Sequence, residues 1–502
     1  MQMPEATGWV IDSGFLSRPS TSRTAKMLPT HFGVLVAGIA LILLWRANMI
    51  AMLRMTLLFS LMGGSAAIIL TALGGSTIQP AIFALGFLFL KAVLPGPGQA
   101  QKFQLAAQDL SFLAIFILYG VAGAFILPNI FAGTIDVTPL RPIPNGYIFA
   151  AFPLSFSSQN ITSAVYLLAT LIAALCGHIA SQGQKSEIAI ARTAATVCGV
   201  HALLGLSSVV LAGTAWVSVL KFFRNGFYAQ LDQTFDGFVR MNGIWPEPAV
   251  FAAYGFAWLV FTTELWLRNV EPKWTGRGAA ILGIALLIST STTAYIGLSA
   301  YGLIIALRML FFPGSVSMRK ALVLISGGMV GLAAILALLA FSPDAANAFA
   351  DFVSKFTVDK ASSASALQRG FWAKQGIDAF WATGGLGVGP GSFRSSSIVT
   401  AVIGSTGLIG CTAIIVHLVR VFKPHYRSTY LRVDNPRQAT GVAASWAAIV
   451  MLIPATFSAA SPDPGFIWGF FCGFALALRR TPADTAKREL HSSEIGLPDA
   501  VL

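Results

Sequence analysis

The sequence predicts an all-α membrane protein, a polytopic transmembrane helical bundle of about 12 or 13 spans. Apolar residues make up 55% of the 502 residues, whereas charged residues make up only 11%. Apolar windows of about 20 residues, the length that a helix needs to cross a hydrocarbon core, recur along the whole chain. The ten-residue alternation of apolar and polar residues that is typical of outer-membrane barrels is missing from the sequence.

A span is expected wherever such a window is bounded by charged residues, glycine or proline. The windows form one membrane domain, 29–480, between polar tails at 1–28 and 481–502. The polar run Ser289–Thr293 separates the eighth span from the ninth. In chain order, the expected spans are Pro29–Trp45, Met55–Leu73, Pro80–Leu94, Leu110–Phe131, Ile161–Ser181, Thr193–Trp216, Ala249–Leu267, two within Gly278–Phe312, Ala321–Ser342, Ile398–Phe422, Ala443–Phe457 and Gly465–Leu478.

The formal net charge is +13, from 33 basic and 20 acidic residues. Most of the basic excess lies in short loops, where it sets membrane orientation, so lipids and not nucleic acid are the expected partners. The basic segments expected on the cytoplasmic side are 182–192, 268–277, 313–320, 423–439 and the residues after 478. The long polar intervals expected on the other face are 133–160, 220–248 and 343–398, the last of which contains short helices.

Neither cysteine nor histidine predicts a metal or cofactor site. All four cysteines lie in apolar runs without a CxxC pair, so unpaired buried thiols are expected. They are Cys176, Cys198, Cys411 and Cys472. His178 and His201 lie within spans and are expected to be packed or hydrogen-bonded helix residues.

The last polar interval holds the first group of candidate site residues. Its amphipathic helix carries Arg369 and Trp372 on one face, and a glycine hinge, Gly384–Gly391, follows it. The hinge leads to Arg394 and Ser395 at the start of the next span. An arginine on an apolar face needs an anionic partner or an aqueous pocket, so both arginines are candidate ligands of an anion.

A second group lies directly before the seventh span, in the run from Arg240 to Pro248. Because Pro248 suits a first helical position, Glu247 is expected near the N-cap, where the helix dipole favours a carboxylate. Two interpretations stay open: a capping glutamate next to an interfacial Trp245, or a carboxylate that takes part in catalysis or sugar binding. Arg141, between prolines in the first polar interval, is a further candidate.

Guanidinium groups stay charged and match phosphate oxygens in a fork geometry. Several arginines on one membrane face therefore fit a diphosphate attached to a lipid, whereas a single exposed arginine is more often a solvated residue. Trp245, Trp372 and Trp381 could stack on sugar rings or anchor the chain in the interface.

Three short motifs carry a family resemblance. They are Arg369-Gly-Phe-Trp372, Gly387-Val-Gly-Pro-Gly-Ser-Phe393 and Gly404-Ser-Thr-Gly-Leu-Ile-Gly410. Together with the many-span layout they resemble the superfamily of O-antigen ligases and O-antigen or exopolysaccharide polymerases, over roughly residues 190–480. The run Arg240–Pro248 is similar to a segment that precedes a span in polymerase-type members. Ligase-type members commonly carry a His-Asn pair where this chain has Arg394–Thr400, so the resemblance favours a polymerase.

The resemblance implies a glycosyltransferase that polymerises undecaprenyl-diphosphate-linked oligosaccharide repeat units at the periplasmic face of the bacterial inner membrane. In this hypothesis Arg369 and Arg394 hold the diphosphate and stabilise negative charge as the glycosyl bond breaks. Glu247 accepts the proton of the acceptor hydroxyl, and Arg240 orients Glu247 or holds a second diphosphate. The expected partners are the lipid-linked donor and acceptor, membrane lipids, a chain-length regulator and a flippase. The remaining substrate-binding candidates are Arg141, Trp245, Trp372 and Ser395.

Two alternatives stay open. A ligase would transfer a finished glycan to another acceptor, and only the missing histidine speaks against it. A transporter of polyisoprenoid-linked glycans would need charged residues in mid-span on a path across the bilayer. The clear ionisable residue within a span is Glu264, near the expected cytoplasmic end, and the other charges gather on one face.

Overall fold

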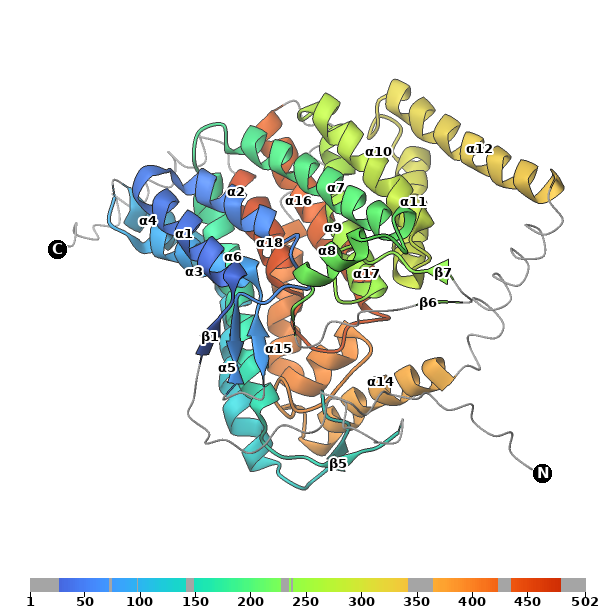
Figure 1. Ribbon diagram of the computed structural model, residues 1–502. Coiled ribbons are helices and arrows are strands. Elements are labelled where there is room, and N and C mark those ends of the chain that lie inside the picture. The colour runs from blue at the N-terminus through green and yellow to red at the C-terminus, as the bar shows by residue number, and fades with distance from the viewer. Residues whose placement is uncertain are drawn as a thin grey trace, which may run out of the picture.

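The computed structural model describes residues 27–71, 75–96, 98–140, 149–226, 234–235, 238–341, 364–422 and 435–479. Within them the chain is an all-α polytopic membrane protein, and Figure 1 shows most of its helices gathered into one bundle, from which α12 (Met318–Phe341) projects. Both polar tails, apart from residues 27 and 28, lie outside the described residues, as do Arg141 and residues 342–363 of the late polar interval.

Seven helices in the described part of the chain are long and apolar enough to cross a membrane. They are α5 (Ser111–Ile130), α6 (Ser158–Ser181), α7 (Ser186–Val210), α9 (Pro248–Leu267), α11 (Thr292–Phe311), α15 (Ile398–Phe422) and the pair α16 (Pro436–Val450) and α17 (Leu452–Ala455). The other helices are α1 (His31–Arg46), α2 (Met49–Phe59), α3 (Pro80–Val93), α4 (Gln99–Asp109), α8 (Trp216–Phe223), α10 (Pro272–Ile288), α12 (Met318–Phe341), α14 (Ala364–Ala382) and α18 (Phe466–Leu478).

Within the described residues, three small antiparallel sheets accompany the helices. The first joins β1 (Met27–Pro29), β2 (Ile68–Leu70) and β3 (Ser76–Ile78), with Met27 opposite Leu70 and Ile68 opposite Ile78. The two others are pairs of two-residue strands, β4 (Asp136–Val137) with β5 (Phe152–Pro153) and β6 (Thr234–Phe235) with β7 (Phe238–Val239).

The helices lie where the spans are expected, but several have other bounds: α16 starts at Pro436 and not at Ala443, and α10 starts at Pro272, inside the expected loop 268–277. The helix expected at Met55–Leu73 is α2, which starts and ends earlier, because Gly63 and Gly64 pack against the segment before α9. A Cβ on Gly64 would lie 2.4 Å from the carbonyl oxygen of Ile244. The sixth expected span is α7, which starts at Ser186, so part of the expected loop 182–192 is helical.

The centre of the bundle is the packing of α18 on α6. Gly469 lies against the backbone of Thr170, and one turn later Gly473 lies against Ala174; a Cβ at either glycine would come within 2.3 Å of a carbonyl oxygen. Small residues let two membrane helices approach closely and so gain dispersion contacts that lipid cannot provide. This contact fixes the depth at which the loop before α18 enters the bundle.

Candidate functional site

The site lies at the end of the bundle where α14 gives way to α15, which we call the hinge end. Figure 1 shows α14 and β5 at this end, in the lower part of the view, and α10 at the far end. The hinge Gly384–Gly391 has five glycines with positive φ, from 59° to 89°. A Cβ on Gly389 or Gly391 would lie 2.4 Å from a carbonyl oxygen of α5 or α6, so the hinge backbone touches both helices directly.

The hinge also supplies hydrogen bonds where the helix α15 is interrupted. Gly407 has φ 56° and ψ −154°, which interrupts the helix. Hinge amides bond to the freed carbonyls, with Val388 N 2.9 Å from Gly404 O and Gly389 N 3.0 Å from Ser405 O. Within a membrane every backbone polar group needs such a partner, and the exchange holds the residues after the hinge in place.

Arg394 follows the hinge and is partly buried. Its backbone amide donates to Thr138 O at 2.8 Å, and its Nη1 donates to Leu140 O at 3.3 Å. The guanidinium carbon lies 4.4 Å from the ring centroid of Trp372, a cation–π contact that brings two of the predicted site residues together. The Nε of Arg394 is buried and has no hydrogen-bond partner within the described residues.

Glu247 is the N-cap residue of α9, as the sequence predicts, but its side chain makes no capping hydrogen bond. No described residue forms an ion pair or hydrogen bond with its carboxylate. The charge of this carboxylate nevertheless affects the pKa values of two arginines. Burial lowers the pKa of Arg240 and of Arg394, and the nearby charge of Glu247 raises both pKa values in part.

Arg369 supplies a second positive charge beside Arg394. Its side chain is exposed on α14, and its backbone carbonyl accepts a hydrogen bond of 2.6 Å from Ser396 Oγ. The charge of Arg369 contributes to lowering the pKa of Arg394. Two guanidinium groups therefore lie near each other without a carboxylate within ion-pair distance in the described residues, which is a suitable arrangement for an anionic ligand with several oxygens.

Two of the predicted site residues are buried and already engaged. The hydroxyl of Ser395 lies 2.8 Å from Thr400 Oγ1 and donates to Ser397 O at 3.1 Å. Trp245 is only 7% exposed and packs against Tyr254, with ring centroids 4.4 Å apart. Trp245 is thus part of the core and is not open for stacking on a sugar. Trp381, in contrast, is 73% exposed.

Arg240 joins the group from the segment before α9. Its Nη2 lies 3.5 Å from Thr290 O, in the polar break between α10 and α11. The site thus combines charges from two polar intervals far apart in the sequence: Arg240 and Glu247 from one, Arg369 and Arg394 from the other. Chemically, the group can bind an anion and can accept a proton.

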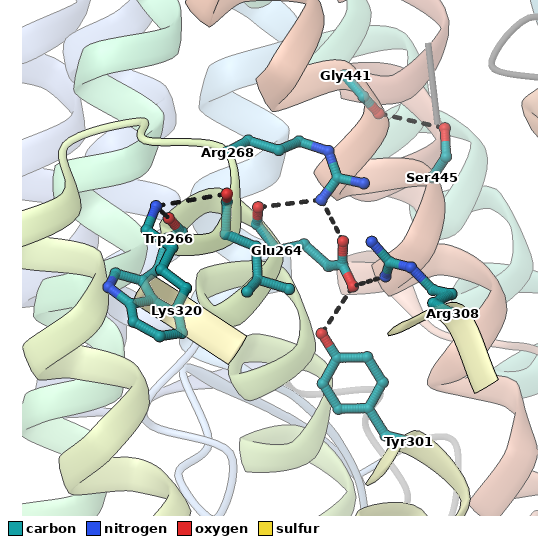
Figure 2. A network of polar contacts seen from close by, with 9 residues as sticks. Glu264, Trp266, Arg268, Tyr301, Arg308, Lys320, Gly441 and Ser445 are labelled. Atoms are coloured by element: carbon teal, nitrogen blue, oxygen red, sulfur yellow. Dashed lines mark hydrogen bonds and ion pairs between the residues drawn. The ribbon is translucent and has the colours of Figure 1, made fainter. Parts of the chain in front are cut away.

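The opposite end of the bundle holds a different set of charges, shown in Figure 2. Glu264 is fully buried and lies 17 residues beyond Glu247 on α9, about 25 Å along the helix at 1.5 Å per residue. Its carboxylate accepts hydrogen bonds from Arg308 Nη1 at 2.6 Å, from Tyr301 Oη at 2.8 Å and from Arg268. This carboxylate is fully paired.

His178 and His201 are packed in the bundle, as the sequence predicts. His178 Nε2 lies 2.9 Å from Asp109 Oδ2, and His201 Nε2 lies 3.1 Å from Phe251 O. His201 also stacks on the ring of Phe251 with centroids 4.0 Å apart. Within the described residues, no group of three or more histidine, cysteine or acidic side chains could hold a metal ion.

Sequence reasoning missed one element of the hinge end, the loop 456–465 between α17 and α18. The amide of Ser395 donates to Ala460 O at 3.1 Å, so this loop adjoins the residue after Arg394. Its run Ser461-Pro-Asp-Pro-Gly465 contains a carboxylate between two apolar spans. This placement is the feature of the sequence that could have identified the loop as part of the site.

No protein-family model matches the chain, and no curated protein sequence matches it.

Proposed function

We propose that this protein is an integral-membrane glycosyltransferase that joins polyisoprenyl-diphosphate-linked oligosaccharide repeat units at the periplasmic face of a bacterial inner membrane. The observation that carries the proposal is the state of Arg394. Its guanidinium group is partly buried over Trp372, beside Arg369 and near Glu247, and no carboxylate in the described residues pairs with it. A half-desolvated cation of this kind is suited to an anionic ligand that arrives from outside the protein.

In the proposed reaction, Arg394 and Arg369 bind the diphosphate of the donor lipid. The acceptor hydroxyl attacks the anomeric carbon of the donor, its proton passes to the Glu247 carboxylate, and the carbon–oxygen bond to the diphosphate breaks. The diphosphate leaves with the electron pair, and the two guanidinium groups stabilise the added negative charge. Arg240, which lies near enough to feel the charge of Glu247, would orient that carboxylate.

The distribution of charge supports a reaction at one face over passage through the bundle. Glu264, the carboxylate deep within a span, is held by two arginines and a tyrosine. A transport path would need ionisable groups that can exchange partners. Arg240, Arg369 and Arg394 instead lie at the hinge end, without an ion pair in the described residues.

The test is the glycan chain length in a producing cell that carries Arg394→Ala or Arg369→Ala. Each variant is expected to reduce polymerisation about 100-fold or more, the typical cost of removing one group that stabilises transition-state charge, and to leave single repeat units at the cell surface. Arg394→Lys keeps the charge but loses the fork, so an intermediate defect is expected.

The matched control is Arg192→Ala. Arg192 is 57% exposed and pairs with Glu271 at 2.9 Å at the opposite end, so its loss should leave chain length unchanged. Accumulation of lipid-linked units inside the cell would indicate a transporter. Normal polymer that is not attached to its final acceptor would indicate a ligase, and long chains from both hinge-end variants would contradict the proposal.

A further inference from the structure

The loop 456–465 reaches deep into the bundle. Its residue Asp463 is hydrogen-bonded to Thr170, which lies near the middle of α6. Thr170 lies 12 residues along α6 from its first residue, Ser158. At a rise of 1.5 Å per residue, the loop therefore descends about 18 Å from that end of α6. Irregular backbone at such depth is stable only where it is buried in protein or lines a water-filled cavity. Most residues from Ala459 to Gly465 are partly exposed, so the loop is not sealed off inside the protein.

The side chain of Asp463 has one engaged oxygen and one free oxygen. Oδ1 accepts from Thr170 Oγ1 at 2.7 Å and from Gly465 N at 3.0 Å. No described residue donates a hydrogen bond to Oδ2, and Asp463 is partly exposed. Two donors on one oxygen fix the direction of the other oxygen, so Oδ2 is a positioned acceptor with no partner.

No cation of the contacting helices balances this carboxylate. Neither α6 nor α18 contains lysine, arginine or another acidic residue, and His178 lies two turns beyond Thr170. In its ionised form the carboxylate has no proton to donate, so Oδ2 acts as an acceptor only.

The loop is connected to the arginine site through its backbone. Ala460 accepts the hydrogen bond from Ser395 N, the residue next to Arg394, and Asp463 follows three residues later. Three residues of extended chain span at most about 10 Å. A ligand of the size of an oligosaccharide diphosphate could therefore contact Arg394 at one end and Asp463 at the other.

We propose that Asp463 is a saccharide-binding residue, whose free Oδ2 accepts a hydrogen bond from a hydroxyl of the sugar while Arg394 holds the diphosphate of the same ligand. This inference rests on the proposed function and adds the group that distinguishes a glycan-bearing lipid from the bare lipid diphosphate. A sugar hydroxyl fits the site because it is a hydrogen-bond donor and an ionised carboxylate oxygen is an acceptor.

The test compares two ligands on the purified full-length protein by native mass spectrometry. One is polyisoprenyl diphosphate, and the other is the lipid-linked repeat unit extracted from a producing strain that lacks this protein. Asp463→Asn is expected to weaken binding of the lipid-linked repeat unit about tenfold or more and to leave the bare lipid diphosphate unchanged. Arg394→Ala is expected to weaken binding of both ligands.

Thr170→Val separates ligand binding from a structural role. Asp463→Asn keeps the oxygen that bonds to Thr170 and Gly465 and changes only the free atom, whereas Thr170→Val breaks the bond to α6 and keeps the carboxylate. If the loss of glycan binding follows Thr170→Val and not Asp463→Asn, then Asp463 only anchors the loop, and the inference is overturned. A wild-type protein that binds the bare lipid diphosphate but shows no preference for the glycan also overturns the inference alone. A wild-type protein that binds neither ligand contradicts the proposed function itself.

Discussion

The two ends of α9 carry the same residue types in opposite states. At one end Glu264 is fully buried and accepts hydrogen bonds from Arg268, Tyr301 and Arg308 (Figure 2). At the other end Glu247 lies near two arginines without an ion pair to either within the described residues.

The difference has a physical reason. A charge in the interior is tolerated only if its partners are fixed, because the desolvation cost is large, and the Glu264 network meets that condition. The hinge-end charges are partly open to solvent, which stabilises them until a ligand replaces the water. Paired charges therefore identify a structural connection between helices, and gathered but unpaired charges identify a candidate site.

The largest expected effect is on the paired end. Glu264→Ala leaves two arginines close together in the interior, so the free energy of unfolding should fall by about 3–5 kcal/mol. Unfolding in mixed detergent micelles measures this change. Glu271→Ala, which breaks the exposed pair with Arg192, is the control and should cost at most about 1 kcal/mol. Equal losses in the two variants would mean that the Glu264 network does not stabilise the bundle.

The hinge provides the next largest effect. Gly389→Ala places a Cβ 2.4 Å from Gly123 O at φ 86°, so backbone strain and overlap add, and a loss of about 3 kcal/mol is expected. Gly384 also has positive φ, 59°, but its Cβ would meet open space. The matched variant Gly384→Ala should therefore cost only about 1 kcal/mol, and the same unfolding measurement compares the two. If both variants lose the same stability, close packing of the hinge on α5 is not what holds it.

The smallest effect on stability is expected at the unpaired end. Arg394→Ala removes one cation–π contact and one long hydrogen bond, so the free energy of unfolding should change by no more than about 1 kcal/mol. Arg308→Ala, at the paired end, should cost several times as much because it leaves Glu264 without one of its cations. Should Arg394→Ala unfold the protein as readily as Arg308→Ala, the distinction between the two ends is wrong.

Much of the fold could be predicted because membrane helices are specified by local composition. The span expected at Leu110–Phe131 is α5, and the one at Ile398–Phe422 has the bounds of α15. The break between α10 and α11 falls at the polar run Ser289–Thr293 as expected, although α11 already begins at Thr292. The early end of α2 could not be foreseen, because it depends on Gly63 and Gly64 meeting a segment about 180 residues further along the chain.

The candidate site could be predicted in its charged residues but not in its neutral ones. Arg240, Glu247, Arg369 and Arg394 gather because an unpaired charge is excluded from the apolar interior and must lie at an end of the bundle. Which neutral side chain of a loop turns inward is decided by packing, so Trp245 and Ser395 are buried against expectation. The role of Asp463 depends on how deep its loop descends, and that depth is set by the contact of α18 with α6.

The interruption of α15 at Gly407 has a consequence for biosynthesis. Leu408 N donates to Gly385 O at 2.8 Å. The first amide after the interruption therefore bonds to a carbonyl outside the helix. Interrupted in this way but without the hinge, the span would expose bare amides and carbonyls to lipid, at a cost of several kcal/mol for each group. The interrupted form of α15 is therefore stable only with the hinge in place, so a nascent chain can adopt it only after both segments have left the ribosome.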